Sequence, residues 1–571
     1  MNNYRLTFLH FLHAKRFNIL FLSLIIASSV LIFYRLGSNS LHNGDEALYS
    51  IISYEMQANG DWITPHFRGE PYFNKPPLKF WLTAPAIRFF GTSEWVVRFW
   101  SAVSSVACVF FTVLLAKKLF GEAESLWAGL SLATCFQFVY EHCAKTGEMD
   151  AIFLFFLVSS LYFLVCSEET PRLLFVSAAL MGLASLTKNF SGFLPFGIGV
   201  FYLLITGKWR NYTRTNAILA GLLFFAISAS WMLVMINIHQ RAFINEFFFR
   251  QVYNRAVSSE YGRGVLGAQN VSGGMLFVGT TIFKGFYPWS LILAPCMSWT
   301  VVQLKRWKKD NYTLPLLWFV GFGIALLFLK NKWHWYVLPI YPAASILVGR
   351  FITRVLSEKG IGWWKTVSFT CLFCGTFLVL PNHTYNLFAL RAVNSVVSHL
   401  AFNPHPARAA LFAVGSIVVW FFAAKGFPRF ADRVALALLS LFAIVSCVLP
   451  LRYATHQAEI KMLTAKIGQE TQTSGGTLYF YGIPKTVFES SNLLWHPAKI
   501  AKWYFSIIPR TRVSFLHNRQ ELRRQLQSDG KGLFLMPGES YQQIRDAYGH
   551  RVLARQTINK KTYILIGTEK E

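Results

Sequence analysis

The stretch WVVRFWSAVSSVACVFFTVLLA, residues 95–116, shows what kind of protein this chain forms. It is almost entirely apolar, Arg98 is its single charged residue, and Lys117 and Lys118 follow it directly. A helix of about 20 apolar residues spans the roughly 30 Å hydrocarbon layer of a membrane. We therefore predict a transmembrane helix here, and similar runs recur along the chain.

The composition of the whole chain also indicates a membrane protein. Of the 571 residues, 54% are hydrophobic and only 14% are charged, whereas soluble proteins carry about 25% charged residues. The formal net charge of +28 would suggest nucleic acid as a partner of a soluble protein. Here most lysines and arginines lie in short loops, where they orient helices and meet anionic lipid. We expect membrane lipids, and no nucleic acid, as partners.

Positively charged loops predict the orientation of the helices. Every second loop is basic, as expected for loops on the cytoplasmic side, and the basic N-terminus lacks the cleavage site of a signal peptide. With an odd number of spans, the N-terminus is cytoplasmic and the C-terminus lies outside. Thirteen spans are predicted, near 18–36, 95–116, 124–141, 150–166, 173–188, 190–206, 215–237, 275–303, 313–329, 335–350, 365–381, 408–424 and 433–451.

The chain divides into a transmembrane domain, 1–451, and a soluble tail, 452–571. In the first outer loop, 37–94, ALYSIISYEM and LKFWLTAPAIRFF are expected to form helices in the membrane interface, the second opened by Pro76 or Pro77. A second outer loop runs from 238 to 274. In the tail, TLYFYG and GLFLMP indicate strands, ESYQQIRDAYG a helix, and RVLARQTI with KTYILIG a hairpin, so a small α/β domain is predicted.

Charged residues gather at the predicted outer membrane edge, where the orientation rule calls for few cations. Desolvated cations and acids at a membrane edge are costly unless they pair or bind a ligand. The charged residues at this edge come from five separate segments, which the topology places on the same side of the membrane: Asp45, Glu46, Lys75, Glu148, Asp150, Lys188, Lys330, Lys332 and His334.

This set of residues predicts a reaction type. A carboxylate can act as general base towards a hydroxyl or bind a divalent cation. Lysines and arginines can hold a phosphate ester and stabilise the charge that develops as it leaves. The combination suits transfer of a group from a lipid phosphate to an acceptor at the outer face. Because that compartment lacks ATP, an activated donor such as a polyprenyl-phosphate sugar is expected.

The chain resembles a known family in several stretches. They are DEALYSIISYEMQANGDWITPHFRGEPYFNKPPLKFWL, the Arg98 region, KTGEMDAIFLF, LTKNFSGFLP, FKGFYPWSLILAP and KNKWHWYVLPIYPA, in this order over residues 20–350. They are similar to the bacterial aminoarabinose transferases, the ArnT family, which are related to protein O-mannosyltransferases. The resemblance implies a type C glycosyltransferase fold in the bacterial inner membrane, with the C-terminal α/β domain in the periplasm. It also implies an undecaprenyl-phosphate sugar donor, lipid A or lipopolysaccharide as acceptor, and polymyxin resistance.

The resemblance also implies roles for individual residues. Asp45 matches the essential acid of the first loop, and Asp150 matches the second acid. Lys75 matches the lysine that grips the carrier phosphate, with Lys188, Arg255, Lys330 and Lys332 as further basic partners. Supporting residues are Glu46, Asn74, Glu148 and His334. Glu46 is expected to favour the start of the following helix or to contact a nearby cation.

One position departs from the family. This chain reads YFNKP where the aminoarabinose transferases typically read YFEKP, so Asn74 replaces a glutamate that is a proposed metal ligand. The substitution argues against a bound divalent cation, for which Asp45 and His334 would be ligands. It also argues against aminoarabinose as the donor sugar, and members of the wider family use hexoses and hexosamines.

The predicted activity is therefore an inverting glycosyl transfer, of an aminopentose, another aminosugar or a hexose. Three alternatives stay open from the sequence. The acceptor could be a protein or another glycan, or the chain could be a polyprenyl-lipid transporter or a scaffold. Transporters often contain inverted repeats, which this sequence lacks, and a scaffold leaves the charged cluster at the outer edge unexplained.

Overall fold

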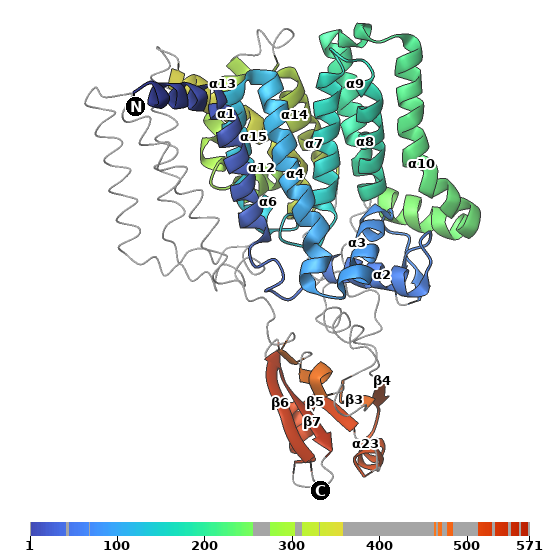
Figure 1. Ribbon diagram of the computed structural model, residues 1–571. Helices are drawn as coiled ribbons and strands as arrows, with labels where there is room; N and C mark the ends of the chain where they lie inside the picture. Colours follow the sequence, from blue (N-terminus) through green and yellow to red (C-terminus); the bar gives the residue numbers. More distant parts are fainter. Residues whose placement is uncertain are drawn as a thin grey trace.

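The computed structural model describes residues 2–41, 45–67, 69–254, 274–302, 311–329, 332–357, 462–463, 466–470, 477–483, 512–527, 532–545, 550–558 and 561–568. Within these residues, four helical stretches are long and apolar enough to cross a membrane: Arg16–Phe33, Glu94–Phe120, Arg214–Arg250 and His334–Arg354. Shorter apolar helices pack beside them (Figure 1). The predicted spans 365–381, 408–424 and 433–451 and the residues Arg255 and Lys330 lie outside the described residues.

Several predicted spans match helices of the structure closely. α7 (Asp150–Cys166) and α8 (Leu173–Lys188) begin and end as predicted, because a charged residue marks one end of each apolar run. α8 leads through the short 3-10 turn η1 (Asn189–Phe193) into α9 (Leu194–Thr206), close to the predicted span 190–206. The other long helices are α1 (Asn2–Phe33), α4 (Glu94–Phe120), α10 (Arg214–Ile244) and α14 (Thr313–Phe328).

Two predicted spans are wrong as continuous helices. The run 124–141 divides into α5 (Glu122–Ala133) and α6 (Phe136–Tyr140), with a break at Thr134 and Cys135. The run 275–303 divides into α12 (Gly274–Gly285) and α13 (Ser290–Val302), where Pro288 cannot continue the helical hydrogen bonds. The predicted span 335–350 lies within the helical stretch His334–Arg354, which begins as the 3-10 segment η5 (His334–Ile340) and continues as α15 (Tyr341–Ser357).

The predicted second outer loop, 238–274, is also partly wrong. Its first residues continue α10 to Ile244, past a kink at Gln240, where φ is 48° and ψ is −125°. A π-helical segment, η3 (Asn245–Asn254), follows. The described part of this region is therefore helical.

Both helices predicted in the first outer loop are present. α2 (Asp45–Asn59) and α3 (Leu78–Phe90) flank the short hairpin of β1 (His66–Phe67) and β2 (Glu70–Pro71). Pro77 is the N-cap of α3. α2 and α3 lie together at one end of the helical part (Figure 1). Many of their residues are buried against neighbouring helices, so they form part of the fold.

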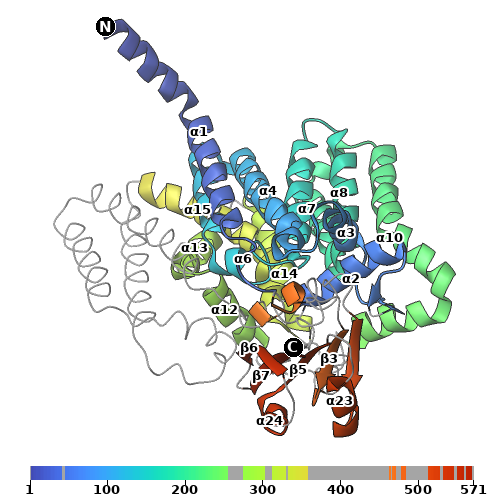
Figure 2. The ribbon, with the colours of Figure 1, turned by 60° about the horizontal axis from the view of Figure 1, so that its bottom comes forward.

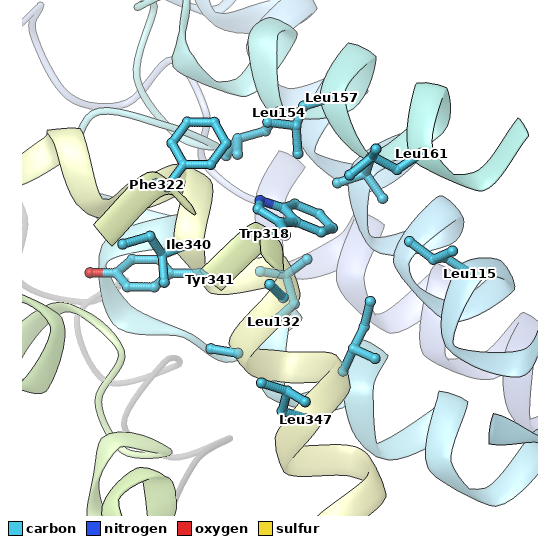
Figure 3. Packing of buried hydrophobic residues seen from close by; sticks show 14 of the residues in the cluster. Leu115, Leu132, Leu154, Leu157, Leu161, Trp318, Phe322, Ile340, Tyr341 and Leu347 are labelled. Carbon is cyan, nitrogen blue, oxygen red and sulfur yellow. The ribbon is translucent and has the colours of Figure 1, made fainter. Parts of the chain in front are cut away.

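The core of the helical part is packed around Trp318 of α14, which is fully buried. Figure 3 shows its indole among leucines of α5 and α7. The indole Nε1 donates to the carbonyl oxygen of Pro339 at 2.7 Å. This bond satisfies a buried donor and fixes η5 against α14 and α7, close to the start of α7.

The C-terminal residues contain a five-stranded mixed sheet in the order β4-β3-β5-β7-β6. The predicted strands and hairpin correspond to β3 (Thr477–Tyr481), β5 (Gly532–Pro537), β6 (His550–Ile558) and β7 (Lys561–Thr568), and β4 (Arg512–Leu516) adds an edge strand. Helix α23 (Arg519–Leu526) follows β4, and α24 (Gly538–Gln542) is shorter than the predicted helix. Figure 1 and Figure 2 place the sheet beyond the end of the helical part that carries α2 and α3.

Candidate active site

A buried ion pair connects α2 to α4. The guanidinium of Arg98 donates from Nε to Oε1 of Glu46 at 2.6 Å and from Nη2 to Oε2 at 3.1 Å. Its remaining donors bond the carbonyl oxygens of Leu36, Asn39 and Ser40 at 2.8–2.9 Å. Both side chains are buried. Glu46 therefore binds a cation, one of its two predicted roles, and helps to position the start of α2.

Gly147 brings the loop before α7 against this ion pair. Its backbone N–H donates to Oε1 of Glu46 at 2.7 Å. A Cβ atom at this position would lie 2.6 Å from Cγ1 of Val97 and 3.1 Å from Cγ of Glu46, which is closer than van der Waals contact allows. The glycine of the GEMD segment thus permits the close approach that joins the loop 141–149 to α2 and α4.

Asp150 is the first residue of α7, where a carboxylate favours the positive end of the helix dipole. Its Oδ1 accepts a hydrogen bond from Nζ of Lys188, the last residue of α8. Its Oδ2 lies 3.2 Å from Nδ1 of His142. Asp150 is buried, with 2% of its surface exposed. The structure therefore brings together two predicted site residues, Asp150 and Lys188.

His142 lies at the centre of the acidic residues, and the sequence reasoning missed it. Its Nε2 is 3.9 Å from Oδ2 of Asp45 and 3.9 Å from Oε1 of Glu148. Its ring stacks on the indole of Trp335, with centroids 4.0 Å apart and planes 4° from parallel. Burial lowers the pKa of His142, but the carboxylates of Glu148, Asp150 and Asp45 outweigh burial and raise it above its usual value.

Asp45 is the more accessible of the two predicted catalytic acids. Its side chain is 23% exposed, and its Oδ2 accepts a hydrogen bond from the hydroxyl of Tyr49 at 3.0 Å. Burial, with the neighbouring Asp45 carboxylate, raises the pKa of Tyr49 well above its usual value, so the hydroxyl stays protonated and donates. Asp45 is therefore held by one turn of α2 while part of its surface faces solvent.

Glu148 and Lys79 are two further buried titratable residues near the predicted catalytic acids. Burial raises the pKa of Glu148 to about 7, against the opposing effect of His142. Burial lowers the pKa of Lys79 to about 8, while Glu148 and Glu46 act in the opposite direction. Nζ of Lys79 donates to the carbonyl oxygen of Val97 at 3.0 Å. Within the described residues, Oε2 of Glu148 is buried without a hydrogen-bond partner.

The other predicted site residues that the structure describes lie in two further segments, one before and at the start of η5 and one between β2 and α3. Lys332 is buried, with 7% exposure, just before η5. His334 opens η5, and its Nε2 is 3.9 Å from Oε2 of Glu141. Lys75 and Asn74 are partly exposed in the turn between β2 and α3. Because Trp335 stacks on His142, the segment that carries Lys332 and His334 packs directly against the acidic residues.

A small, mostly apolar hollow lies close by. One side is formed by Pro76, which follows Lys75, and the other by Ser185 and Leu186 near the Lys188 end of α8. It is also lined by Trp231 and Met232 of α10, by Phe247 of η3, and by Phe193 and Ser228. The hollow thus lies between the two segments that carry predicted phosphate-binding lysines.

The residues described here do not fit the divalent cation that the resemblance implies. Across the described part of the chain, no three side chains of His, Cys, Asp or Glu are grouped as ligands of one ion. The space between the carboxylates of Asp45, Glu148 and Asp150 holds the imidazole of His142, and Asn74 offers a neutral amide.

The chain is similar to several known proteins. Residues 74–234 match the family described as dolichyl-phosphate-mannose-protein mannosyltransferase. An uncharacterized protein of Aquifex aeolicus is 26% identical over 372 residues, which cover 64% of this chain and 70% of that protein. The undecaprenyl phosphate-alpha-4-amino-4-deoxy-L-arabinose arabinosyl transferase 1 of Pseudomonas fluorescens is 26% identical over 345 residues. That match covers 59% of this chain and 58% of the Pseudomonas protein's own length.

The fold is shared with a solved structure. The crystal structure of ArnT from Cupriavidus metallidurans bound to undecaprenyl phosphate matches with a TM-score of 0.66 and 20% identity, covering 98% of this chain and 99% of that one. The chain therefore has the type C glycosyltransferase fold of a multi-pass membrane protein. Its family-model match and its relatives show that the chain is similar to the ArnT-like glycosyltransferases.

Proposed function

We propose that this protein transfers a sugar from undecaprenyl phosphate to lipid A, or to another part of lipopolysaccharide, at the outer face of the bacterial inner membrane. The observation that supports this most is the meeting of Asp45 and Asp150 at His142, beside Lys188. Acids at the ends of membrane helices, next to cations, suit a reaction at a lipid phosphate.

In the proposed reaction an acceptor oxygen attacks the anomeric carbon of the donor sugar. The bond from that carbon to the phosphate oxygen breaks, the polyprenyl phosphate leaves with the bonding electrons, and the configuration is inverted. Asp45 takes the proton when the acceptor is a hydroxyl. A lipid A phosphate is already anionic, and Asp45 then orients the donor. Asp150, which Lys188 and His142 hold in place, supports Asp45 electrostatically.

The donor phosphate is proposed to bind the cations at the outer edge. Lys75, Lys332 and the residues Arg255 and Lys330 are its proposed ligands, because lysine and arginine bind phosphate oxygens. Lys188 already pairs with Asp150, so its proposed role is to hold that acid.

Mass spectrometry of lipid A and core oligosaccharide tests the donor and the acceptor together. A strain that lacks the gene is compared with its parent, and the deletion is complemented with the wild-type gene or with Asp45→Asn. We expect a mass loss of one aminopentose, hexose or hexosamine, which the wild-type gene restores and the variant does not. Unchanged lipopolysaccharide would contradict the proposed acceptor and favour a protein or another glycan.

A further inference from the structure

His142 adopts an unusual backbone conformation for a side chain of its size. Its φ of 63° lies in the left-handed region, which non-glycine residues rarely adopt and which costs about 1 kcal/mol or more. The loop is held around it by hydrogen bonds from the backbone N–H groups of Ala144 and Lys145 to the carbonyl oxygens of Phe138 and Val139, at 3.0 and 3.1 Å. Its backbone is therefore fixed in a strained conformation that points the imidazole at the acids.

The imidazole of His142 contacts two acids that belong to different helices. Asp45 belongs to α2 and Asp150 to α7. Nδ1 of His142 is bonded to Asp150, and Nε2 faces Asp45 and Glu148. Because the His142 ring lies between the carboxylates of Asp45 and Asp150, it sets their separation. Asp45 is otherwise held by Tyr49 alone in the described hydrogen bonds.

The flat face of the His142 ring also makes a contact. Trp335 stacks flat on it, and Trp335 in turn stacks on Trp333, with centroids 4.8 Å apart. These tryptophans flank His334 and follow Lys332 directly. Any shift of His142 is therefore passed to the segment that carries the basic residues, and the ring joins the acidic and basic parts of the site.

We infer that His142 is a positioning residue of the proposed transfer reaction, which fixes Asp45 relative to Asp150 and aligns both with the segment 332–336. The inference rests on the proposed function and adds a residue to it. His142 does not contact the donor or exchange a proton in this account. It acts through the two acids, whose spacing the imidazole sets.

The experiment measures kcat and KM for the donor in purified wild-type protein and in His142→Ala and His142→Gln. A misplacement of about 1 Å can lower turnover about 100-fold, so we expect a loss of this size in kcat for the alanine variant with KM changed by less than about threefold. Free imidazole should raise kcat of the alanine variant at least tenfold, because truncation of His142 leaves a ring-sized space beside Trp335.

A matched control separates positioning from folding. His550 in the C-terminal sheet also pairs with an aromatic residue, Tyr541, at 3.2 Å, and His550→Ala should keep wild-type kcat. Losses in His142 variants that follow a lowered unfolding temperature and resist imidazole would overturn the inference. So would variants within threefold of wild type. Absence of transfer by the wild-type protein itself would instead overturn the proposed function.

Discussion

The imidazole of His142 and the indole of Trp335 stack with their centroids 4.0 Å apart, although one belongs to the loop before α7 and the other to η5. Stacked aromatic pairs contribute about 0.5–1.5 kcal/mol beyond their buried area. The contact connects the acids at the ends of α2 and α7 with the segment that begins at Lys332. Weakening this contact should therefore lower the rate of the proposed reaction.

Replacing Trp335 with leucine should lower the rate of sugar transfer about tenfold, which corresponds to about 1.4 kcal/mol, because the flat face against His142 is lost. Trp335→Phe keeps an aromatic face and should lose less than about threefold. The measurement is initial rate with saturating donor. Equal rates in both variants and in wild type would show that the stack has no part in the reaction.

Replacing Arg98 with alanine should destabilise the protein by about 3–5 kcal/mol, because the buried carboxylate of Glu46 then loses the cation that pairs with it. Thermal unfolding in detergent measures the effect, and Arg88→Ala, at an exposed site on α3, serves as the control. The double variant Arg98→Met with Glu46→Gln should recover part of the loss, since both charges of the pair are removed together. A double variant less stable than Arg98→Ala would contradict this account of the pair.

Replacing Gly147 with alanine should destabilise the protein by about 1–3 kcal/mol, because the added Cβ overlaps Val97. Adding Val97→Ala removes the clashing methyl groups and should restore part of the stability. Gly197→Ala is the matched control, because nothing lies within 4 Å of a Cβ there. Similar unfolding temperatures for the 147 and 197 variants would refute the close approach.

Glu148 predicts a pH dependence of stability. Burial raises its folded-state pKa to about 7 from 4.5, so between these values the folded protein holds a proton that the unfolded chain releases. This contribution is fully present below about pH 4.5 and is lost as the pH rises through about 7. Relative to Glu148→Gln, wild-type protein should therefore lose stability from pH 5 to pH 8. A difference that stays constant with pH would contradict the prediction.

The sequence predicted those elements whose signals are local. Apolar length and terminal charges marked α7 and α8, and alternating apolar residues marked the hairpin of β6 and β7. The breaks at Thr134 and before α13 were missed, because a run of apolar residues looks the same whether its helix is continuous or interrupted. The side of the membrane on which each loop lies stays a prediction.

Part of the site could also be read from the sequence, and part could not. Asp45, Asp150 and Lys188 were predicted from charges at span ends and from the family resemblance, and the structure brings Asp150 and Lys188 into contact. His142 was missed because a single histidine has no periodic pattern and its partners lie in other elements. Its signal was the pair Glu141 and His142 directly before a basic and glycine-containing turn, in a chain poor in acids.

Sugar transfer by purified Asp45→Asn, compared with wild type, tests the central claim most directly. Labelled undecaprenyl-phosphate sugars of the aminopentose, hexose and hexosamine classes are offered with lipid A, and the labelled product is measured. The account predicts transfer from one of these donors by the wild-type protein and a loss of at least about 100-fold in the variant, with the unfolding temperature unchanged. Near-normal transfer by Asp45→Asn, or no transfer by wild type from any of these donors, would contradict it.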